Sequence, residues 1–234
     1  MKYSRSGTGR FAQRLFFTVD EIDRLCFDAL KKVDLLPSAP EPIRIDRFVE
    51  KYFECPLEYK DLGEGILGCT QFNRKGTVVL ITISDSNGNS APSERRLRSS
   101  LAHEAGHGLM HASLFIDDGL QQEMVGSNID LENRRILCRQ SDIGPARAKA
   151  YDGRWWEWQA NRAIGGLLLP KRLVSASLEK LIAKTSALGV PTLPETSRRA
   201  AILQIAETFE VNPIVAQIRL EEIFPARLQA QMSL

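Results

Sequence analysis

His103-Glu104-Ala105-Gly106-His107 is the stretch on which the interpretation of this sequence depends. The chain contains three histidines, and the third, His111, follows in the same short segment. On a helix, the spacing H-E-x-x-H places both imidazoles on one face and one turn apart, where they can hold one zinc ion with the glutamate beside them as a base. The alternative is a surface helix that carries two histidines at this spacing by chance. The residues downstream favour the metal site.

The residues around this motif predict a helix from Ser93, a candidate N-cap, to about Ala112. At about 100° per residue, His103 and His107 lie on roughly the opposite side of this helix from its aliphatic residues. We therefore expect a helix that is buried on one side and lines a site on the other. The aliphatic stripe consists of Leu97, Leu101, Ala105, Gly108, Leu109 and Ala112.

Length and composition fit one domain with a small appendage. A chain of 234 residues with 43% hydrophobic residues can bury a sizeable core. We expect a disordered N-terminus over 1–17, a main domain over 18–193 and a helical appendage over 194–234 packed on it. The 31 Lys and Arg residues nearly balance the 29 Asp and Glu residues, and the net charge of +2 argues against a protein that mainly binds nucleic acid or an anionic membrane.

The sequence predicts a cytoplasmic protein that does not enter a membrane. The basic segment 1–14 is followed by Leu15-Phe16-Phe17, an apolar run too short for a signal peptide. The nearest approach to a membrane span, Ala163 to Leu169, is also far too short. The cysteines lack C-x-x-C spacing and are expected to be buried thiols in a reducing compartment; they are Cys26, Cys55, Cys69 and Cys138.

The order of predicted elements indicates an α+β fold with a small antiparallel sheet. Thr18-Val19-Asp20-Glu21 has the pattern of a capping box and opens the first helix, and Asp46 is expected to cap a second, short helix through Phe53. Strands are predicted at 66–72 and 77–84, joined as a hairpin, and at 135–138. Further helices are predicted at 155–169, 171–188, 197–209 and 214–223.

A catalytic zinc site needs a third protein ligand and an open position for water. His111 lies about 12 Å from His103 along the helix axis, so one ion cannot bind it together with both other histidines. We expect it to support a ligand or to face the substrate. Peptide deformylases use a cysteine upstream of H-E-x-x-H, which makes Cys69 an alternative, although their glycine-rich segment is missing here.

Glu157 is the third ligand that we favour. On a helix, Glu157 and Asn161 share one face one turn apart, so a ligand carboxylate would be accompanied by an amide. That amide could orient a ligand histidine. The alternative is an ordinary surface glutamate, and spacing alone does not decide between the two.

Two longer segments carry a resemblance to a known family. Arg98-Ser-Ser-Leu-Ala-His-Glu-Ala-Gly-His-Gly-Leu-Met-His111 and Trp156-Glu-Trp-Gln-Ala-Asn-Arg-Ala-Ile-Gly-Gly-Leu-Leu-Leu-Pro170 resemble the two motifs of the ImmA/IrrE metallo-endopeptidases. The resemblance covers about 85–170 closely and the upstream helices and hairpin more loosely. Departures from the family pattern are Ala163, where the family has Phe, and Gly165-Gly166, which cost about 1 kcal/mol each in helix propensity.

The resemblance implies a zincin-like fold of minimal gluzincin type and a zinc peptidase. It implies that His103, His107 and Glu157 bind zinc and that Glu104 is the catalytic glutamate. It also implies a protein substrate, a helix-turn-helix repressor, and a role against that repressor in a mobile element, a phage or a stress response. A different hypothesis is a zinc-stabilised regulatory binding protein that hydrolyses nothing.

Several further predictions concern the surroundings of this site. His111 and Tyr151 are candidates for the group that stabilises the oxyanion. The strand 77–83, if it forms an edge of the cleft, could pair with an extended substrate. The C-terminal helix pair resembles a helix-turn-helix in outline, but Arg219 stands against Glu221 and Glu222 on its second helix, so we favour a structural role over direct nucleic-acid binding.

Overall fold

The computed structural model describes residues 2–4, 14–86, 93–116, 129–130, 133–140, 154–183 and 191–225. The strands are β1 (Lys2–Ser4), β2 (Arg14–Phe16), β3 (Leu57–Tyr59), β4 (Ile66–Phe72), β5 (Val78–Ile83), β6 (Ile129–Asp130) and β7 (Arg135–Arg139). The helices are α1 (Val19–Lys32), α2 (Ile45–Phe53), α3 (Glu94–Met110), α5 (Trp155–Leu168), α6 (Lys171–Ser177), α7 (Glu195–Thr208) and α8 (Pro213–Ile223), with a 3-10 turn at Ala112–Phe115.

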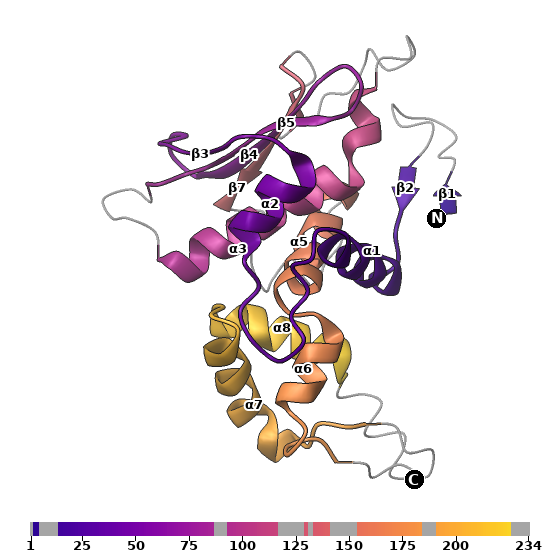
Figure 1. The fold of residues 1–234 in the computed structure, drawn as a ribbon, viewed down its shortest axis with the longest axis vertical. Coiled ribbons are helices and arrows are strands. Elements are labelled where there is room, and N and C mark those ends of the chain that lie inside the picture. Colours follow the sequence, from indigo (N-terminus) through magenta and orange to yellow (C-terminus); the bar gives the residue numbers. More distant parts are fainter. Residues whose placement is uncertain are drawn as a thin grey trace.

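The architecture is α+β, with a sheet at one end and helices at the other (Figure 1). Helix α3 lies along the sheet, α5 packs on α3, and α6, α7 and α8 lie farthest from the sheet. Within the segment expected to be disordered, β1 pairs antiparallel with β2. Among the helices of the described ranges, none has the length and apolarity that a bilayer crossing requires.

The main sheet has five strands in the order β3-β5-β4-β7-β6. The predicted hairpin is confirmed as β4 and β5, and the predicted strand at 135–138 is confirmed as β7. The sheet is mixed, however, where an antiparallel sheet was predicted. β4 runs antiparallel to β5, as in any hairpin. β3 lies on the other side of β5 and runs parallel to it. β3 pairs only with residues 81–83 of β5, so this half of the strand is internal to the sheet, and the predicted pairing of β5 with an extended substrate stays a prediction for residues 78–80.

The two faces of the sheet have different neighbours. Alternate residues of a strand point to opposite faces, and on the face toward α3 the row Ile83, Gly68 and Cys138 crosses β5, β4 and β7. Ile83 and Cys138 are fully buried there. Cys69 instead points to the opposite face, where it lines a cavity with Leu80 and Leu137. This alternation decides which side chains of β4 and β7 can reach the histidines.

Local signals predicted most helix boundaries but not all. The capping box is confirmed, since the Glu21 N–H donates to Thr18 Oγ1 at 3.3 Å and the Thr18 N–H donates to Glu21 Oε2 at 2.9 Å. The predicted cap of α2 is wrong, because the helix begins one residue before Asp46. Helix α6 ends at Ser177 and not near 188, because the chain turns and residues 183 and 192 exchange two backbone hydrogen bonds.

Close packing of α3 against α5 depends on a glycine of the H-E-x-x-H motif. A Cβ atom built on Gly106 would lie 2.7 Å from the Cβ of Ala163 and 3.2 Å from the Cα of Ala160. Small residues on both helices therefore allow the helices to approach closely, and this close approach brings His103, His107 and Glu157 together. The histidine face of α3 is covered as a result, so this helix is buried on both sides and not on one side as predicted.

Helix α8 is attached to α5 and α1 through a buried arginine. The Arg219 side chain donates from Nε to the Leu169 carbonyl at 3.0 Å and pairs with Asp23 at 2.8 Å and Glu222 at 3.0 Å. An arginine held in this way has no surface left for a phosphate group. The paired glycines of α5 fit the same arrangement, because Gly165 packs against Arg219 and its neighbour packs against α1.

Candidate metal centre

Helices α3 and α5 bring three potential ligands to one point. His103 Nε2 and His107 Nε2 are 3.0 Å apart on successive turns of α3. Glu157, in the first turn of α5, places Oε2 3.2 Å from His103 Nε2 and Oε1 3.7 Å from His107 Nε2. All three side chains are buried. Two imidazole nitrogens and one carboxylate are a ligand set that zinc enzymes use, and these residues could hold a metal ion.

The unsatisfied polar atoms of this site fit a cation. Neither oxygen of Glu157 accepts a well-aligned hydrogen bond from the described residues, although both are buried. A buried carboxylate without hydrogen bonds is strongly disfavoured unless a positive charge faces it. A divalent ion between Glu157 and the two Nε2 atoms would provide that charge.

The hydrogen bonds behind His103 leave its Nε2 atom able to bind a metal. His103 Nδ1 lies 3.1 Å from Asn161 Oδ1, an amide oxygen that can only accept. Nδ1 therefore carries the proton, and Nε2 presents a lone pair toward Glu157. Asn161 thus lies where the sequence predicted an amide that orients a ligand histidine.

A longer chain of hydrogen bonds sets the same tautomer in His107. Gln159 Oε1 accepts from His111 Nε2 at 3.0 Å, so His111 Nδ1 is the acceptor for His107 Nδ1–H at 2.9 Å. His107 Nε2 is left with its lone pair. Both ring nitrogens of His111 are therefore engaged and none remains for an oxyanion, which removes His111 as a candidate for that role; Tyr151 lies outside the described residues.

Glu104 is held apart from the three ligands by strand β4. The Thr70 hydroxyl donates to Glu104 Oε2 at 2.6 Å. The other oxygen, Oε1, is buried against Gly68, where a Cβ atom would lie 2.5 Å from it, and has no hydrogen-bond partner among the described residues. The sequence analysis did not identify Gly68 and Thr70 as neighbours of Glu104. Their role becomes visible only where the hairpin packs against α3.

Burial controls the pKa values of these groups. Desolvation raises the pKa of Glu104 to about 8, against the lowering effects of His103 and of the Thr70 hydrogen bond. Burial also takes the pKa of His107 well below its usual value and lowers that of His111 to about 4. For His103, burial acts to lower the pKa, but the Glu157 carboxylate, 3.2 Å from Nε2, outweighs burial and raises the pKa above its usual value. A metal ion would add its own charge to this balance.

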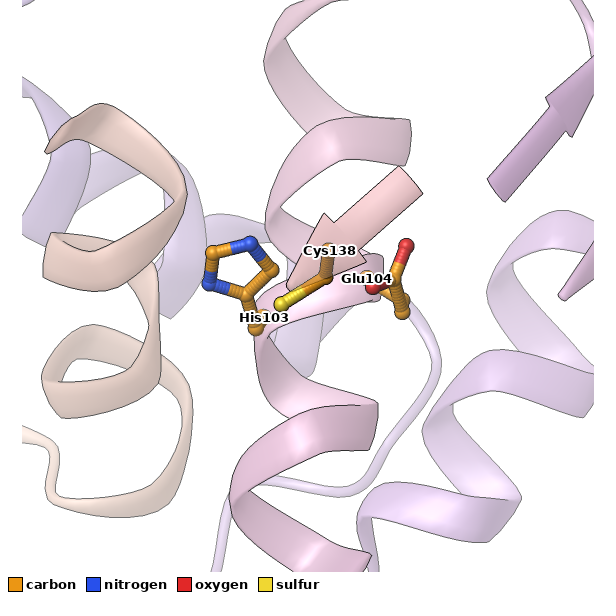
Figure 2. Close-up of side chains that lie close together, drawn as sticks. All are labelled: His103, Glu104 and Cys138. Atoms are coloured by element: carbon orange, nitrogen blue, oxygen red, sulfur yellow. The ribbon is translucent and has the colours of Figure 1, made fainter. Parts of the chain in front are cut away.

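The structure places Cys138, and not Cys69, beside the histidines. Cys69, the alternative third ligand, points to the sheet face away from α3 and is excluded. Cys138 on β7 instead forms a second potential ligand group with His103 and Glu104, the ligand atoms lying within 4.8 Å of one another (Figure 2). Sequence reasoning treated Cys138 as an ordinary buried thiol. The alternation along β7, with Ile136 and Cys138 on one face, was the available signal.

No family model and no curated protein matches this chain.

Proposed function

We propose that this protein is a zinc-dependent endopeptidase of the ImmA/IrrE type, with a zincin-like fold. The observation that carries the proposal is the meeting of His103 Nε2, His107 Nε2 and the orphaned Glu157 carboxylate at one buried point. The resemblance of two sequence segments to that family adds to it. Three protein ligands are the number that a hydrolytic zinc site uses.

The chain's own residues then have separate tasks. Zinc bound to His103, His107 and Glu157 would lower the pKa of water and polarise a peptide carbonyl. Glu104 is the general base: it takes a proton from water and delivers it to the leaving amine. The Thr70 hydroxyl keeps Glu104 on the strand side of the site, and Asn161 and His111 hold the imidazoles in the binding tautomer.

The proposed substrate is a protein, and the resemblance points to a helix-turn-helix repressor in the cytoplasm. The buried ion pairs of Arg219 support a structural role for α8, so nucleic acid is not the proposed partner. Endopeptidase activity on a repressor would relieve repression.

Metal analysis tests the ligand set. Wild-type protein, purified without chelator and supplied with zinc, should hold about one zinc ion per chain by mass spectrometry. Glu157→Ala should weaken or lose the metal, and Glu104→Gln should keep it. Wild-type protein that holds no zinc would refute the proposal.

A cleavage assay can be run on a whole cell extract, which contains every candidate substrate at once. Extract from cells that lack the protein is incubated with zinc-loaded wild type or with Glu104→Gln, and new protein N-termini are identified by mass spectrometry. Peptide bonds should be cut by the wild type alone, because only the general base differs. A zinc-stabilised binding protein would instead give identical profiles, and its biological effect would survive Glu104→Gln.

A further inference from the structure

The sheet face turned away from the metal centre carries a cavity of about 210 Å³. Helix α3 packs on the other face (Figure 1). We call this space the outer cavity. One wall is the connection from β3 to β4, with Lys60, Leu62 and Ile66. The floor is made of two rows of paired residues across β5, β4 and β7, which are Thr82, Cys69 and Leu137, and Leu80, Gln71 and Arg135.

Two polar groups of the floor have hydrogen-bonding capacity to spare. Thr82 is only 2% exposed, and Gln71 is partly buried. Within the described part of the chain, neither the Thr82 hydroxyl nor the Gln71 side-chain amide takes part in a hydrogen bond. A buried hydroxyl without a partner is disfavoured. A ligand in the outer cavity that carries a hydrogen-bonding group would remove this penalty.

The charge of the lining indicates what kind of group this is. Both charged residues of the lining, Lys60 and Arg135, are cations. Lys60 Nζ lies 3.0 Å from Glu58 Oε2, but both side chains are about half exposed, and an ion pair of this kind contributes little. An incoming anion can therefore compete for Lys60. Most of the remaining lining is aliphatic, namely Leu62, Ile66, Leu80 and Leu137.

We propose that the outer cavity is a binding site for a small aliphatic carboxylate. The cations and the Thr82 hydroxyl complement its oxygens, and the leucine and isoleucine side chains complement its carbon chain. Its volume is below the range of about 300–1,000 Å³ that drug-sized ligands occupy, so the chain has only a few carbons. Because the outer cavity and the metal centre lie on opposite faces of the sheet, binding requires no metal.

NMR of the metal-free, ¹⁵N-labelled full chain tests the proposal, with hexanoate as the probe. Zinc is removed first because carboxylates are also zinc ligands. Hexanoate should cause saturable shifts of the backbone amides of β4, β5 and β7 that line the outer cavity. Acetate should bind far more weakly, since each buried methylene tightens binding by about fourfold. Hexylamine, with the same chain and the opposite charge, should not bind there. Saturable shifts confined to α3 and α5, or no saturable shifts, would overturn the inference.

Variants identify the groups that bind the carboxylate. Lys60→Gln combined with Arg135→Gln should weaken hexanoate binding by about tenfold or more. The matched control is Arg74→Gln combined with Lys75→Gln, which removes two exposed cations at the turn of the same hairpin, outside the outer cavity, and should leave the affinity unchanged.

A single isosteric variant covers the case in which the double variant does not fold. Thr82→Val keeps the shape of the side chain, removes the hydroxyl and should weaken hexanoate binding by about tenfold. Equal affinity of the wild type and Thr82→Val, or equal affinity of hexanoate and hexylamine for the wild type, would overturn the inference. Neither result would affect the proposed function, which depends on zinc binding at the other face.

Discussion

Replacement of Gly106 by alanine should weaken metal binding although Gly106 is not a ligand. The added Cβ would lie 2.7 Å from the Ala163 Cβ, where ordinary contacts begin at 3.4 Å, and 3.2 Å from the Ala160 Cα. Neither neighbour is the end of a flexible side chain, so helix α5 must move away from α3. Because α5 carries Glu157 and Asn161, the movement withdraws a ligand and the amide that orients His103.

Two opposing terms set the stability change. Alanine is better than glycine in a helix by about 1 kcal/mol, and overpacking of a core costs about 1–3 kcal/mol. We therefore expect the free energy of unfolding of metal-free Gly106→Ala to fall by about 0–2 kcal/mol. Metal affinity should fall more clearly, by about tenfold or more, since loss of one orienting partner alone costs about 10–100-fold.

A double-mutant cycle separates this clash from other effects. Metal affinity is measured by competition with a chelator, and stability by urea unfolding, for Gly106→Ala, Ala163→Gly and the double variant. Ala163→Gly removes the nearest clashing atom, so the double variant should recover part of the affinity lost in Gly106→Ala. A Gly106→Ala protein that is about 1 kcal/mol more stable and binds zinc normally would show that the two helices are not constrained here.

Three further predictions address the other supports of the site. Gly68→Ala should place a methyl group against the Glu104 carboxylate, reducing hydrolysis by about 100-fold or more while zinc content stays unchanged; loss of zinc would contradict a role limited to the base. His111→Ala should lower zinc affinity by about 10–100-fold in a chelator competition, because His107 loses its acceptor; unchanged affinity would remove this role. Zinc affinity should also fall by about tenfold per pH unit once the pH drops below the raised pKa of His103, since the proton and the metal compete for its lone pair, and a titration that is flat through this range would refute that competition.

Local patterns were sufficient to predict the elements that carry the proposed ligands. The one-turn spacing of His103 and His107 and the apolar periodicity of 155–169 depend only on helix geometry. The hairpin depends on a turn between two short segments, of which the second is rich in Val, Ile and Thr. Glu157 was favoured because it shares a helix face with Asn161, but spacing alone did not decide the choice, and the family resemblance implied the same ligand. The structure brings these three side chains together from two separate helices.

Features that depend on long-range pairing were not predictable in the same way. The parallel β3–β5 pair follows from which strands meet, and no local spacing encodes it. The identity of the relevant cysteine likewise required the β4–β7 register, because a shift by one residue would exchange the faces on which Cys69 and Cys138 lie. The predicted end of α6 near residue 188 was wrong for a similar reason. Residues 183 and 192 form backbone hydrogen bonds with each other, and a helix that continued through 183 could not form them.

Burial of two carboxylates between α3, α5 and the sheet has no structural benefit of its own. Glu104 and Glu157 are almost inaccessible to solvent, and three of their four oxygens have no hydrogen-bond partner among the described residues. Well-packed apolar side chains at such positions are often the more stable choice. The arrangement becomes favourable when a cation faces Glu157. Thr70 and Gly68 meanwhile hold Glu104 aside, and this separation distinguishes a base from a fourth oxygen ligand.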